Sequence, residues 1–286
     1  MRVAFLVPDP DYPAEWRWAY DAEADALTAA GITVEPVPWT DPRDLSHFDL
    51  ILPLVAWGYH QRYAEWLAFL DRLEREHVPV ANPAPLLRWN SDKVYLAQLS
   101  ETGIATVPTI AVEHLDEQVL AKARLQFDCS DLVVKPPVSA SAFGTYRLKE
   151  GDPFPDVVRG WRMMVQPWVA GILDQGEYSL ILFDGELSHA LSKVPKSGEF
   201  RVQPEYGGII HRCDPPPGSE ALARAALAAA PAPSSYARVD MVVGASGELQ
   251  VMELELIEPA LFLDHAPEAG AKFVRAIRSA AERAGE

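Results

Sequence analysis

The sequence has little that would suit a disulfide, a thiolate metal site or a membrane span. Its 286 residues include two cysteines, Cys129 and Cys213, in no metal-binding or redox spacing, and seven scattered histidines. We expect both thiols to be free, as in a reducing compartment. No apolar run reaches the roughly 18 residues of a membrane span, and the apolar N-terminal stretch is too short for a signal peptide. These absences predict a cytoplasmic protein.

Positive charge is also scarce. There are 25 Lys and Arg residues against 41 Asp and Glu residues, which gives a formal net charge of −16. Such a chain repels phosphate at long range, so nucleic acid and anionic membranes are not expected as partners. The sequence also lacks G-x-S-x-G, H-E-x-x-H, a P-loop and a G-x-G-x-x-G after a strand. A phosphorylated ligand would therefore need local cations or a bridging metal.

The hydrophobic pattern predicts an α/β chain, α+β overall. Residues 1–85 read as a small doubly wound domain with a parallel sheet, with strands at 3–7, 50–55 and 78–83 and helices at 14–30 and about 59–76. Residues 86–105 read as a connecting helical segment with Asn90 or Ser91 as N-cap and Gly103 as C-terminal stop. Residues 106–165 read as a central subdomain containing a helix near 115–126. Residues 166–286 read as mainly antiparallel strands, with a hairpin turn at 184–185 and helices near 219–229 and 268–284.

The most informative stretch is V-M-E-L-E-L-I-E-P at 251–259, which reads as a strand although it holds three glutamates. Side chains alternate along a strand, so Glu253 and Glu255 share one face, while Met252 is expected to face the core and Glu258 to lie apart. If this strand pairs with residues 236–243, Asp240 joins the two glutamates. Three carboxylates together repel one another unless cations neutralise them, and Mg²⁺ prefers such oxygen ligands. A solvated sheet face is the alternative.

Three basic positions are also notable. Lys135 ends an apolar strand beside a loop of small residues at 139–144, which suits a phosphate site, although it could instead reach solvent from the sheet edge. Lys93 is expected in the first turn of its helix, where the helix dipole disfavours a cation unless an anion compensates. The segment 192–208 gathers Lys193, Lys196 and Arg201 around a turn, as an anion site or as a solvated loop. His60, in W-G-Y-H, is the histidine that we consider for substrate contact.

Taken in order, six segments resemble the ATP-grasp superfamily, and most closely its bacterial glutathione synthetase-like branch. They are N-P-A-P-L-L-R-W-N-S-D-K, V-V-K-P with its small-residue loop, M-V-Q-P-W-V, S-K-V-P-K-S-G-E-F-R-V-Q-P-E-Y-G-G, R-V-D-M-V-V and V-M-E-L-E-L-I-E-P. A closer likeness, carried by W-G-Y-H, K-P-P-V-S-A-S-A-F-G-T and E-L-E-L-I-E-P, is to the O-ureido-serine cyclo-ligases of cycloserine biosynthesis and their relatives. The resemblance implies an ATP-grasp fold with an N-terminal substrate domain, a central lid and a C-terminal catalytic subdomain.

The resemblance also implies roles for individual residues. Lys93 and Lys135 would contact the ATP phosphates, beneath a phosphate loop that includes Ser139, Ser141 and Gly144. Gln166, Trp168 and Val169 would border the adenine, and Glu177 would contact the ribose. Asp240, Glu253 and Glu255 would hold Mg²⁺, as two ions, with Mn²⁺ as an alternative. Lys193 and Arg201 would stabilise the transferred phosphoryl group. The substrate would meet Tyr59, His60, Arg88, Gly207 and Gly208.

Two positions depart from the glutathione synthetase pattern. Glu255 stands where an asparagine is usual, and Val202-Gln203 follows Arg201 in place of a small residue and an asparagine. The extra charge at Glu255 bears on metal binding, and the second departure bears on the substrate contacts.

The implied activity is ligation of a small, amino-acid-like carboxylate, activated as an acyl phosphate and then attacked by an amine, either from a second molecule or within the same one. The alternatives are a small-molecule kinase of the same fold and a nucleotide-binding module without catalysis. The expected partners are small molecules, and a homodimer is the family-level expectation.

Overall fold

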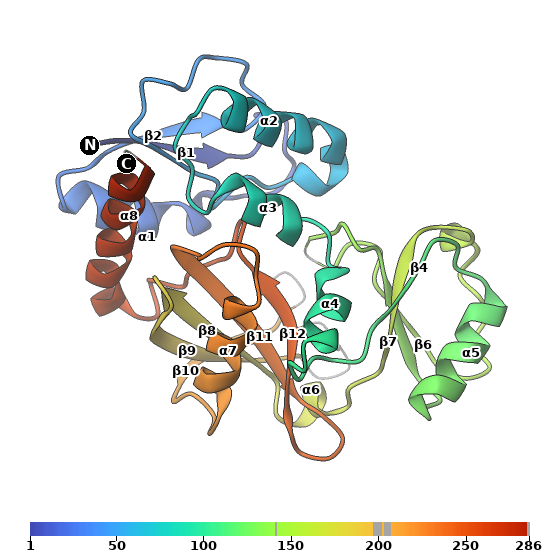
Figure 1. The fold of residues 1–286 in the computed structure, drawn as a ribbon. Coiled ribbons are helices and arrows are strands. Elements are labelled where there is room, and N and C mark those ends of the chain that lie inside the picture. Colours follow the sequence, from blue (N-terminus) through green and yellow to red (C-terminus); the bar gives the residue numbers. More distant parts are fainter. Residues whose placement is uncertain (141, 197–201, 203–206, 285–286) are drawn as a thin grey trace.

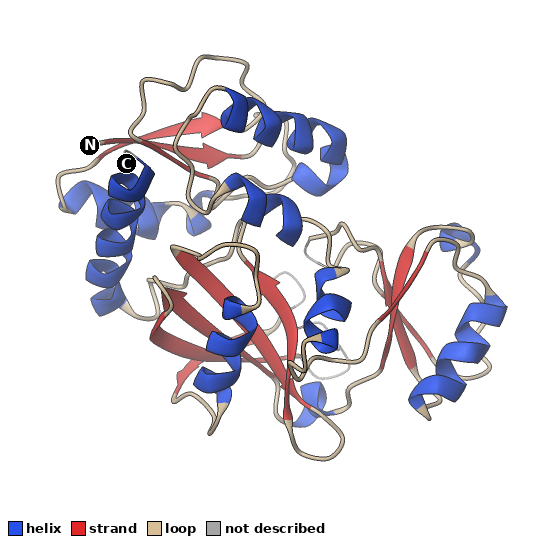
Figure 2. Cartoon of the chain, viewed as in Figure 1, coloured by secondary structure: helices blue, strands red, loops and turns tan. Residues whose placement is uncertain are grey.

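The computed structural model describes residues 1–140, 142–196, 202 and 207–284. Within these ranges the chain forms three β-sheets with helices packed around them (Figures 1 and 2). The first sheet is parallel and the other two are antiparallel, which confirms the predicted α/β class. In the described part of the chain, no helix is both long and apolar enough to cross a bilayer.

The N-terminal sheet has the order β2-β1-β3. Its central strand β1 (Arg2–Val7) is covered on both faces, because Phe5 packs in the cluster with helix α1 while Leu6 packs in the cluster with Trp66 of helix α2. Burial on both faces explains the continuous apolar run. The surrounding elements are α1 (Asp21–Ala29), β2 (Thr33–Pro38), β3 (Leu50–Leu52), α2 (Tyr63–Arg75) and, from the far end of the chain, α8 (Gly270–Ala284), which lies beside α1 (Figure 1).

Three predicted elements differ here. The regular helix begins at Asp21, after a 3-10 turn at Arg17–Ala19, and not at residue 14. The expected strand at 78–83 is reduced to one bridge between Ile51 and Val80, since Pro79 and Pro83 lack the N–H groups that extend a ladder. Strand β2 was not predicted because it contains two prolines, which an edge strand tolerates.

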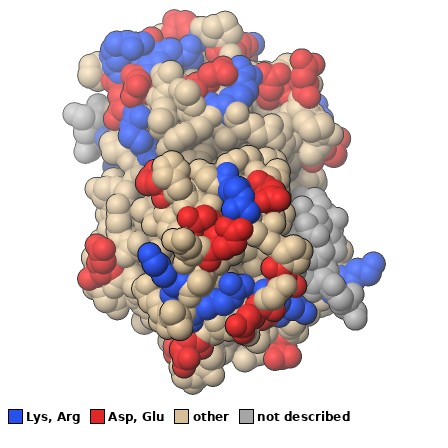
Figure 3. All heavy atoms as spheres, turned by 90° about the vertical axis from the view of Figure 1, so that its right-hand side faces the viewer, with Lys and Arg blue, Asp and Glu red and all other residues tan. Residues whose placement is uncertain are grey.

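The central sheet has the order β4-β7-β5-β6 and is covered on one side by α5 (Glu117–Phe127). Asp116 caps this helix by accepting a hydrogen bond from the backbone N–H of Val119 at 2.8 Å. The side of the molecule that carries this sheet faces the viewer in Figure 3, and acidic and basic side chains are interspersed on it. The strands are β4 (Ile110–Val112), β5 (Leu132–Lys135), β6 (Tyr146–Leu148) and β7 (Met163–Pro167).

The C-terminal sheet has the order β10-β9-β8-β11-β12. Asp184 and Gly185 turn between β8 and β9, both with positive φ, as the hairpin prediction requires. The elements are α6 (Gly171–Asp174), β8 (Glu177–Phe183), β9 (Glu186–Val194), β10 (Ile209–Cys213), α7 (Ser219–Ala228), β11 (Tyr236–Val243) and β12 (Leu249–Glu255).

Two buried asparagines join the N-terminal half to the ends of β11 and β12. Asn82 donates to the carbonyls of Tyr236 and Leu256, at 2.9 and 2.7 Å. Asn90 donates to the carbonyl of Leu254 at 2.8 Å and accepts from the N–H of Leu256 at 2.9 Å. These bonds fix the end of β12 against the N-terminal domain.

The connecting segment corrects two expectations. It is two helices, α3 (Ala84–Asn90) and α4 (Tyr95–Glu101), so Asn90 ends the first helix and neither Asn90 nor Ser91 caps the second. Lys93 lies in the turn before α4, outside its first turn, and its backbone N–H donates to the carbonyl of Pro137 at 2.9 Å. Gly103 follows the end of α4 with φ +86°, as predicted.

Candidate functional site

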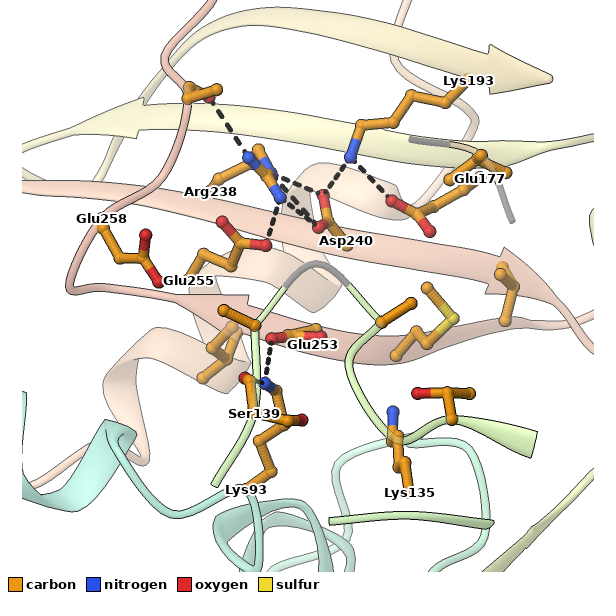
Figure 4. A pocket seen from close by; sticks show the side chains of 18 of the residues that line it. Lys93, Lys135, Ser139, Glu177, Lys193, Arg238, Asp240, Glu253, Glu255 and Glu258 are labelled. Carbon is orange, nitrogen blue, oxygen red and sulfur yellow. Dashed lines mark hydrogen bonds and ion pairs between the residues drawn. The ribbon is translucent and has the colours of Figure 1, made fainter. Parts of the chain in front are cut away.

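A cavity of about 540 Å³ lies where the three sheets meet. The N-terminal domain contributes aromatic side chains, the central sheet contributes Lys135 and the segment around Trp168, and the C-terminal sheet contributes most of the charge. Figure 4 shows the charged side chains converging from β8, β9, β11 and β12 on one side and from the turn before α4 and the end of β5 on the other. The cavity is therefore the candidate active site.

The acidic wall is built by β11 and β12. These strands pair antiparallel with Asp240 opposite Glu253 and Arg238 opposite Glu255, so the predicted carboxylates do share one face. A β-bulge leaves Met252 without a partner on β11. The bulge changes the side-chain parity, so Val251 packs in the core and Met252 lines the cavity, contrary to the expectation that Met252 faces the core.

Arg238 organises this wall. It is only 7% exposed, its Nε and Nη2 donate to Asp240 at 3.0 Å, and it also pairs with Glu255. Burial alone would raise the pKa of Asp240, but Arg238 and Lys193 together hold it at about 2. Burial raises the pKa of Glu255 to about 7 although Arg238 opposes the rise. Asp240 is thus the firmly ionised member of the group.

A second buried pair joins Lys193 of β9 to Glu177 of β8. Their side chains meet at 2.7 Å, and Lys193 also reaches Asp240 at 3.5 Å. Lys193 lies within a strand, not in the turn where it was expected. Glu177 lines the cavity, as a ribose contact would require, but its carboxylate is held by Lys193.

Lys93 links the acidic wall to the small-residue loop. Its ammonium lies 3.1 Å from Glu253 and donates to the carbonyl of Ser139. Glu253 is thus the anion that neutralises Lys93, although Lys93 lies outside the first turn of α4, where the expectation based on the helix dipole had placed it. The loop is tightly folded, because a Cβ on Gly144 (φ +67°) would lie 2.8 Å from Pro136.

Lys135 stands apart from these pairs. Its side chain lines the cavity and forms no hydrogen bond or ion pair with any described residue. Burial lowers its pKa, while the charge of Glu253 opposes that change. A cation in this condition is suited to bind an anionic ligand.

The far wall offers a surface for a planar group. Gln166, Trp168 and Val169 line it, as predicted for an adenine site. The amide of Gln166 donates to Thr109 at 2.8 Å, and the guanidinium of Arg147 lies 4.0 Å from the ring centre of Trp168. These contacts hold Gln166 and Trp168 in place.

Some of the residues predicted to contact the substrate lie at the cavity, and others do not. Tyr59 lines the cavity. His60 lies beside it, with a buried Nδ1 that has no partner among the described residues, a ring 5.8 Å from that of Phe143, and a pKa that burial lowers to about 4. Arg88 is directed elsewhere, because it pairs with Asp71 and Glu74 at 2.6 and 3.0 Å.

Gly207 and Gly208 are not among the residues that line the cavity, and a Cβ on Gly207 would lie 3.1 Å from Lys196. Ser141 and Arg201 fall outside the described residues.

The carboxylates of the acidic wall are the residues that could hold a metal ion. In the described ranges no three His, Cys, Asp or Glu side chains are grouped as a metal site, because each carboxylate of the wall points to a lysine or arginine. The donors themselves are all carboxylate oxygens on one face, which is the chemistry that Mg²⁺ requires. The residues therefore have the chemistry that Mg²⁺ needs, and Lys93 and Arg238 neutralise their charges in this structure.

Sequence reasoning missed two residues of the site. Arg238 lies two positions before Asp240 in an apolar strand, so strand alternation alone could have placed both on one face. Glu258 was expected to lie apart from Glu255, but it lines the same cavity, because the chain leaves the strand after Glu255 and parity no longer applies. Burial raises the pKa of Glu258 to about 8, and the charge of Glu255 adds to the rise.

Known proteins resemble the chain over much of its length. Residues 3–82 match the family model described as D-cycloserine synthetase DcsG, N-terminal domain. The cycloserine biosynthesis protein DcsG of Streptomyces lavendulae is 31% identical over 280 residues, which cover 88% of this chain and 90% of that protein. Glutathione synthetase of Vibrio cholerae is 30% identical over 195 residues, 65% of this chain and 58% of that protein.

A solved structure agrees with these sequence matches. The crystal structure of D-cycloserine synthetase DcsG superposes with a TM-score of 0.84 at 28% identity, covering 99% of this chain and all of that one. The predicted resemblance to the glutathione synthetase-like branch and to the cyclo-ligases is confirmed. The chain belongs to the ATP-grasp ligase family, in the group that contains DcsG.

Proposed function

We propose that the protein activates a small, amino-acid-like carboxylate with ATP and joins it to an amine, forming a C–N bond. The observation that carries the proposal is the cavity itself. Its described lining holds four cations, Lys93, Lys135, Lys193 and Arg238, which lie among the carboxylates or, for Lys135, across the cavity from them, beside a planar surface. This supports binding of a polyphosphate and its purine together with a small acid.

The nucleotide would lie between the central and C-terminal sheets. Lys135 has no partner in the described chain, so a phosphate would neutralise it without breaking an existing pair. Lys93 would add a second contact, and the loop with Ser139, Ser141 and Gly144 would close over the phosphates. The base would lie against the wall of Gln166, Trp168 and Val169, with Glu177 near the ribose.

Asp240, Glu253 and Glu255 would hold Mg²⁺, as two ions, with Mn²⁺ as a substitute. When bound, the metal would neutralise the phosphate oxygens and hold the terminal phosphoryl group in line. Lys93 and Arg238 offset the charges of these carboxylates, and a bound metal would share that role.

The chemistry needs no side-chain nucleophile. The substrate carboxylate oxygen attacks the γ-phosphorus and ADP leaves, giving an acyl phosphate. An amine nitrogen then attacks the acyl carbon, loses a proton, and inorganic phosphate leaves with the bonding electrons. Lys193, Arg238 and Arg201 would stabilise the charge that develops on the phosphoryl oxygens.

The substrates would be small molecules that enter from the side of Tyr59 and His60, with Gly207 and Gly208 as more distant contacts. Arg88 is not included, because it pairs with Asp71 and Glu74. The likeness to DcsG, whose name refers to cycloserine, favours ring closure within one substrate, and the glutathione synthetases favour joining two. We propose a cytoplasmic enzyme that acts as a homodimer without nucleic-acid or membrane partners.

The test is Mg²⁺-dependent ADP release over a panel of amino acids and related acids, run with and without hydroxylamine. An acyl phosphate is captured by hydroxylamine as a hydroxamate. A kinase acting on a hydroxyl would release ADP without hydroxamate, and a binding module would bind ATP without releasing ADP. Either result would overturn the proposal.

A further inference from the structure

The charges that line the cavity are almost all paired. Lys193 neutralises Glu177, Lys93 neutralises Glu253, and Arg238 lies between Asp240 and Glu255. Glu15, also in the lining, accepts hydrogen bonds from the backbone N–H groups of Trp16 and Arg17, at 3.1 and 2.9 Å.

Two charged groups in the lining form no hydrogen bond or ion pair with any described residue, namely Lys135 and Glu258. One is a cation and the other an anion. Figure 4 shows them at opposite sides of the view, with Glu253 between them. A bound ligand pair that neutralised both would need an anionic group at one end and a cationic group at the other.

Of these two groups, Glu258 lies at the end of the cavity where we propose that the substrate binds. It follows β12 by three residues, at the point where Asn82 and Asn90 fix the strand end to the N-terminal domain. Tyr59 lines the same cavity. Burial raises the pKa of its phenol, and the charge of Glu258 adds to the rise. The phosphate-binding features, by contrast, lie around Lys135 and the loop that begins at Pro136.

A half-buried carboxylate without a partner is unfavourable, and Glu255 beside it adds repulsion. A cationic ligand group would remove both penalties and favour the ionised form of Glu258. Aromatic side chains from the N-terminal domain, including Trp57 and Tyr59, line the same cavity, and such rings favour an ammonium group over an anion.

We infer that Glu258 binds a protonated amine of the substrate and makes the enzyme select ammonium-bearing acids over their deaminated analogues. This inference rests on the proposed function for its second substrate group, the carboxylate that is activated. It assigns Glu258 to recognition and leaves metal binding to Asp240, Glu253 and Glu255.

The experiment compares wild type with Glu258→Gln, which keeps the shape and removes the charge. A matched control is Glu248→Gln, which makes the same change at an exposed site on the turn before β12. Alanine, serine and glutamate, each as both enantiomers, are titrated calorimetrically against protein with Mg²⁺ and a non-hydrolysable ATP analogue. Propionate, 3-hydroxypropionate and glutarate are their deaminated partners, and ADP release is measured with ATP for every compound.

We expect wild type and Glu248→Gln to bind at least one amino acid in preference to its deaminated partner. Glu258→Gln should lower that preference about 10- to 100-fold, the range expected for a charged hydrogen bond. Its thermal unfolding midpoint should not fall, because glutamine replaces a carboxyl group that forms no hydrogen bond or ion pair with any described residue and that burial keeps largely protonated without ligand. The dependence of ADP release on Mg²⁺ concentration should also stay the same.

The inference is overturned if wild type shows no preference for the amine, including the case in which nothing binds, or if Glu258→Gln keeps the preference. A shift in Mg²⁺ dependence without a change in preference would also overturn it, because it would make Glu258 a metal residue. Selective binding without ADP release would leave the amine site standing and defeat the ligase proposal. ADP release by Glu258→Gln with unchanged selectivity would defeat the amine site and leave the ligase proposal standing.

Discussion

Glu23 provides a quantitative test of how the N-terminal domain joins the rest of the chain. It lies on α1, is only 3% exposed, and one of its carboxylate oxygens has no hydrogen-bond partner in the described structure. Burial raises its pKa from 4.5 to about 8, and the charge of Asp264 adds to the rise. The side chain is therefore protonated in the folded protein at pH 7 and ionised in the unfolded chain.

The sign of the pH dependence follows from this difference. Between pH 4.5 and 8 the folded state binds one more proton at Glu23 than the unfolded state does, so the free energy of unfolding falls as pH rises. The pKa difference of 3.5 (8 minus 4.5) corresponds to about 5 kcal/mol at about 1.4 kcal/mol per pKa unit, as an upper limit. Most of this loss is complete by pH 8.

The Glu23→Gln variant has no proton to lose, so it should lack this loss. We expect it to match wild type near pH 5 and to exceed it by several kcal/mol at pH 8.5. Urea denaturation at the two pH values measures the difference, with Asp25→Asn as the control, because Asp25 is exposed on the same helix. Parallel changes in wild type and Glu23→Gln between these pH values would refute the reasoning.

Three further predictions concern the site. Lys135→Ala should weaken ATP binding about tenfold or more without loss of fold, as measured by nucleotide titration. The control, Lys122→Ala, changes an exposed lysine and should keep the wild-type affinity. Wild-type affinity in Lys135→Ala would refute the role of Lys135. Arg238→Met should lower stability by about 3–5 kcal/mol, since it removes the cation that lies between Asp240 and Glu255, and it should abolish ADP release. Stability in denaturation and activity at wild-type levels would contradict the role. Gly144→Ala should weaken nucleotide binding several-fold, because the added Cβ would collide with Pro136. Gly151→Ala should not, because Gly151 also has a positive φ but no atom lies close to an added Cβ. Equal effects of the two variants in nucleotide titration would show that the loop does not bind the nucleotide.

Much of the fold could be predicted from the sequence because its signals are local. The hairpin at residues 184–185, the ends of α7 and α8, and the pairing of β11 with β12 follow from turn residues and periodicity. Strand β2 could not be predicted, since its two prolines contradict strand propensity and only its edge position permits them. The bulge at Met252 depends on how two strands fit, which one strand does not specify.

The site divides in the same way. Lys135, Glu253 and Glu255 stand out locally, as charges in apolar strands. The partners of these charges do not, since Lys93 and Glu253 are 160 positions apart and meet only through tertiary packing. Arg238 is the exception, because its spacing from Asp240 within one strand was visible in the sequence. Glu258 lies beyond the strand end, where no periodicity applies.

The central claim is that the cavity activates a carboxylate with ATP, using the acidic wall to hold the metal. The most direct measurement is hydroxamate formation with ATP, Mg²⁺, hydroxylamine and the amino-acid panel, comparing wild type with Glu253→Gln. We expect wild type to form ADP and hydroxamate together and Glu253→Gln to form neither, with the variant still folded as judged by circular dichroism and thermal unfolding. Hydroxamate at the wild-type rate from Glu253→Gln, or ADP from wild type with no hydroxamate, would contradict the account.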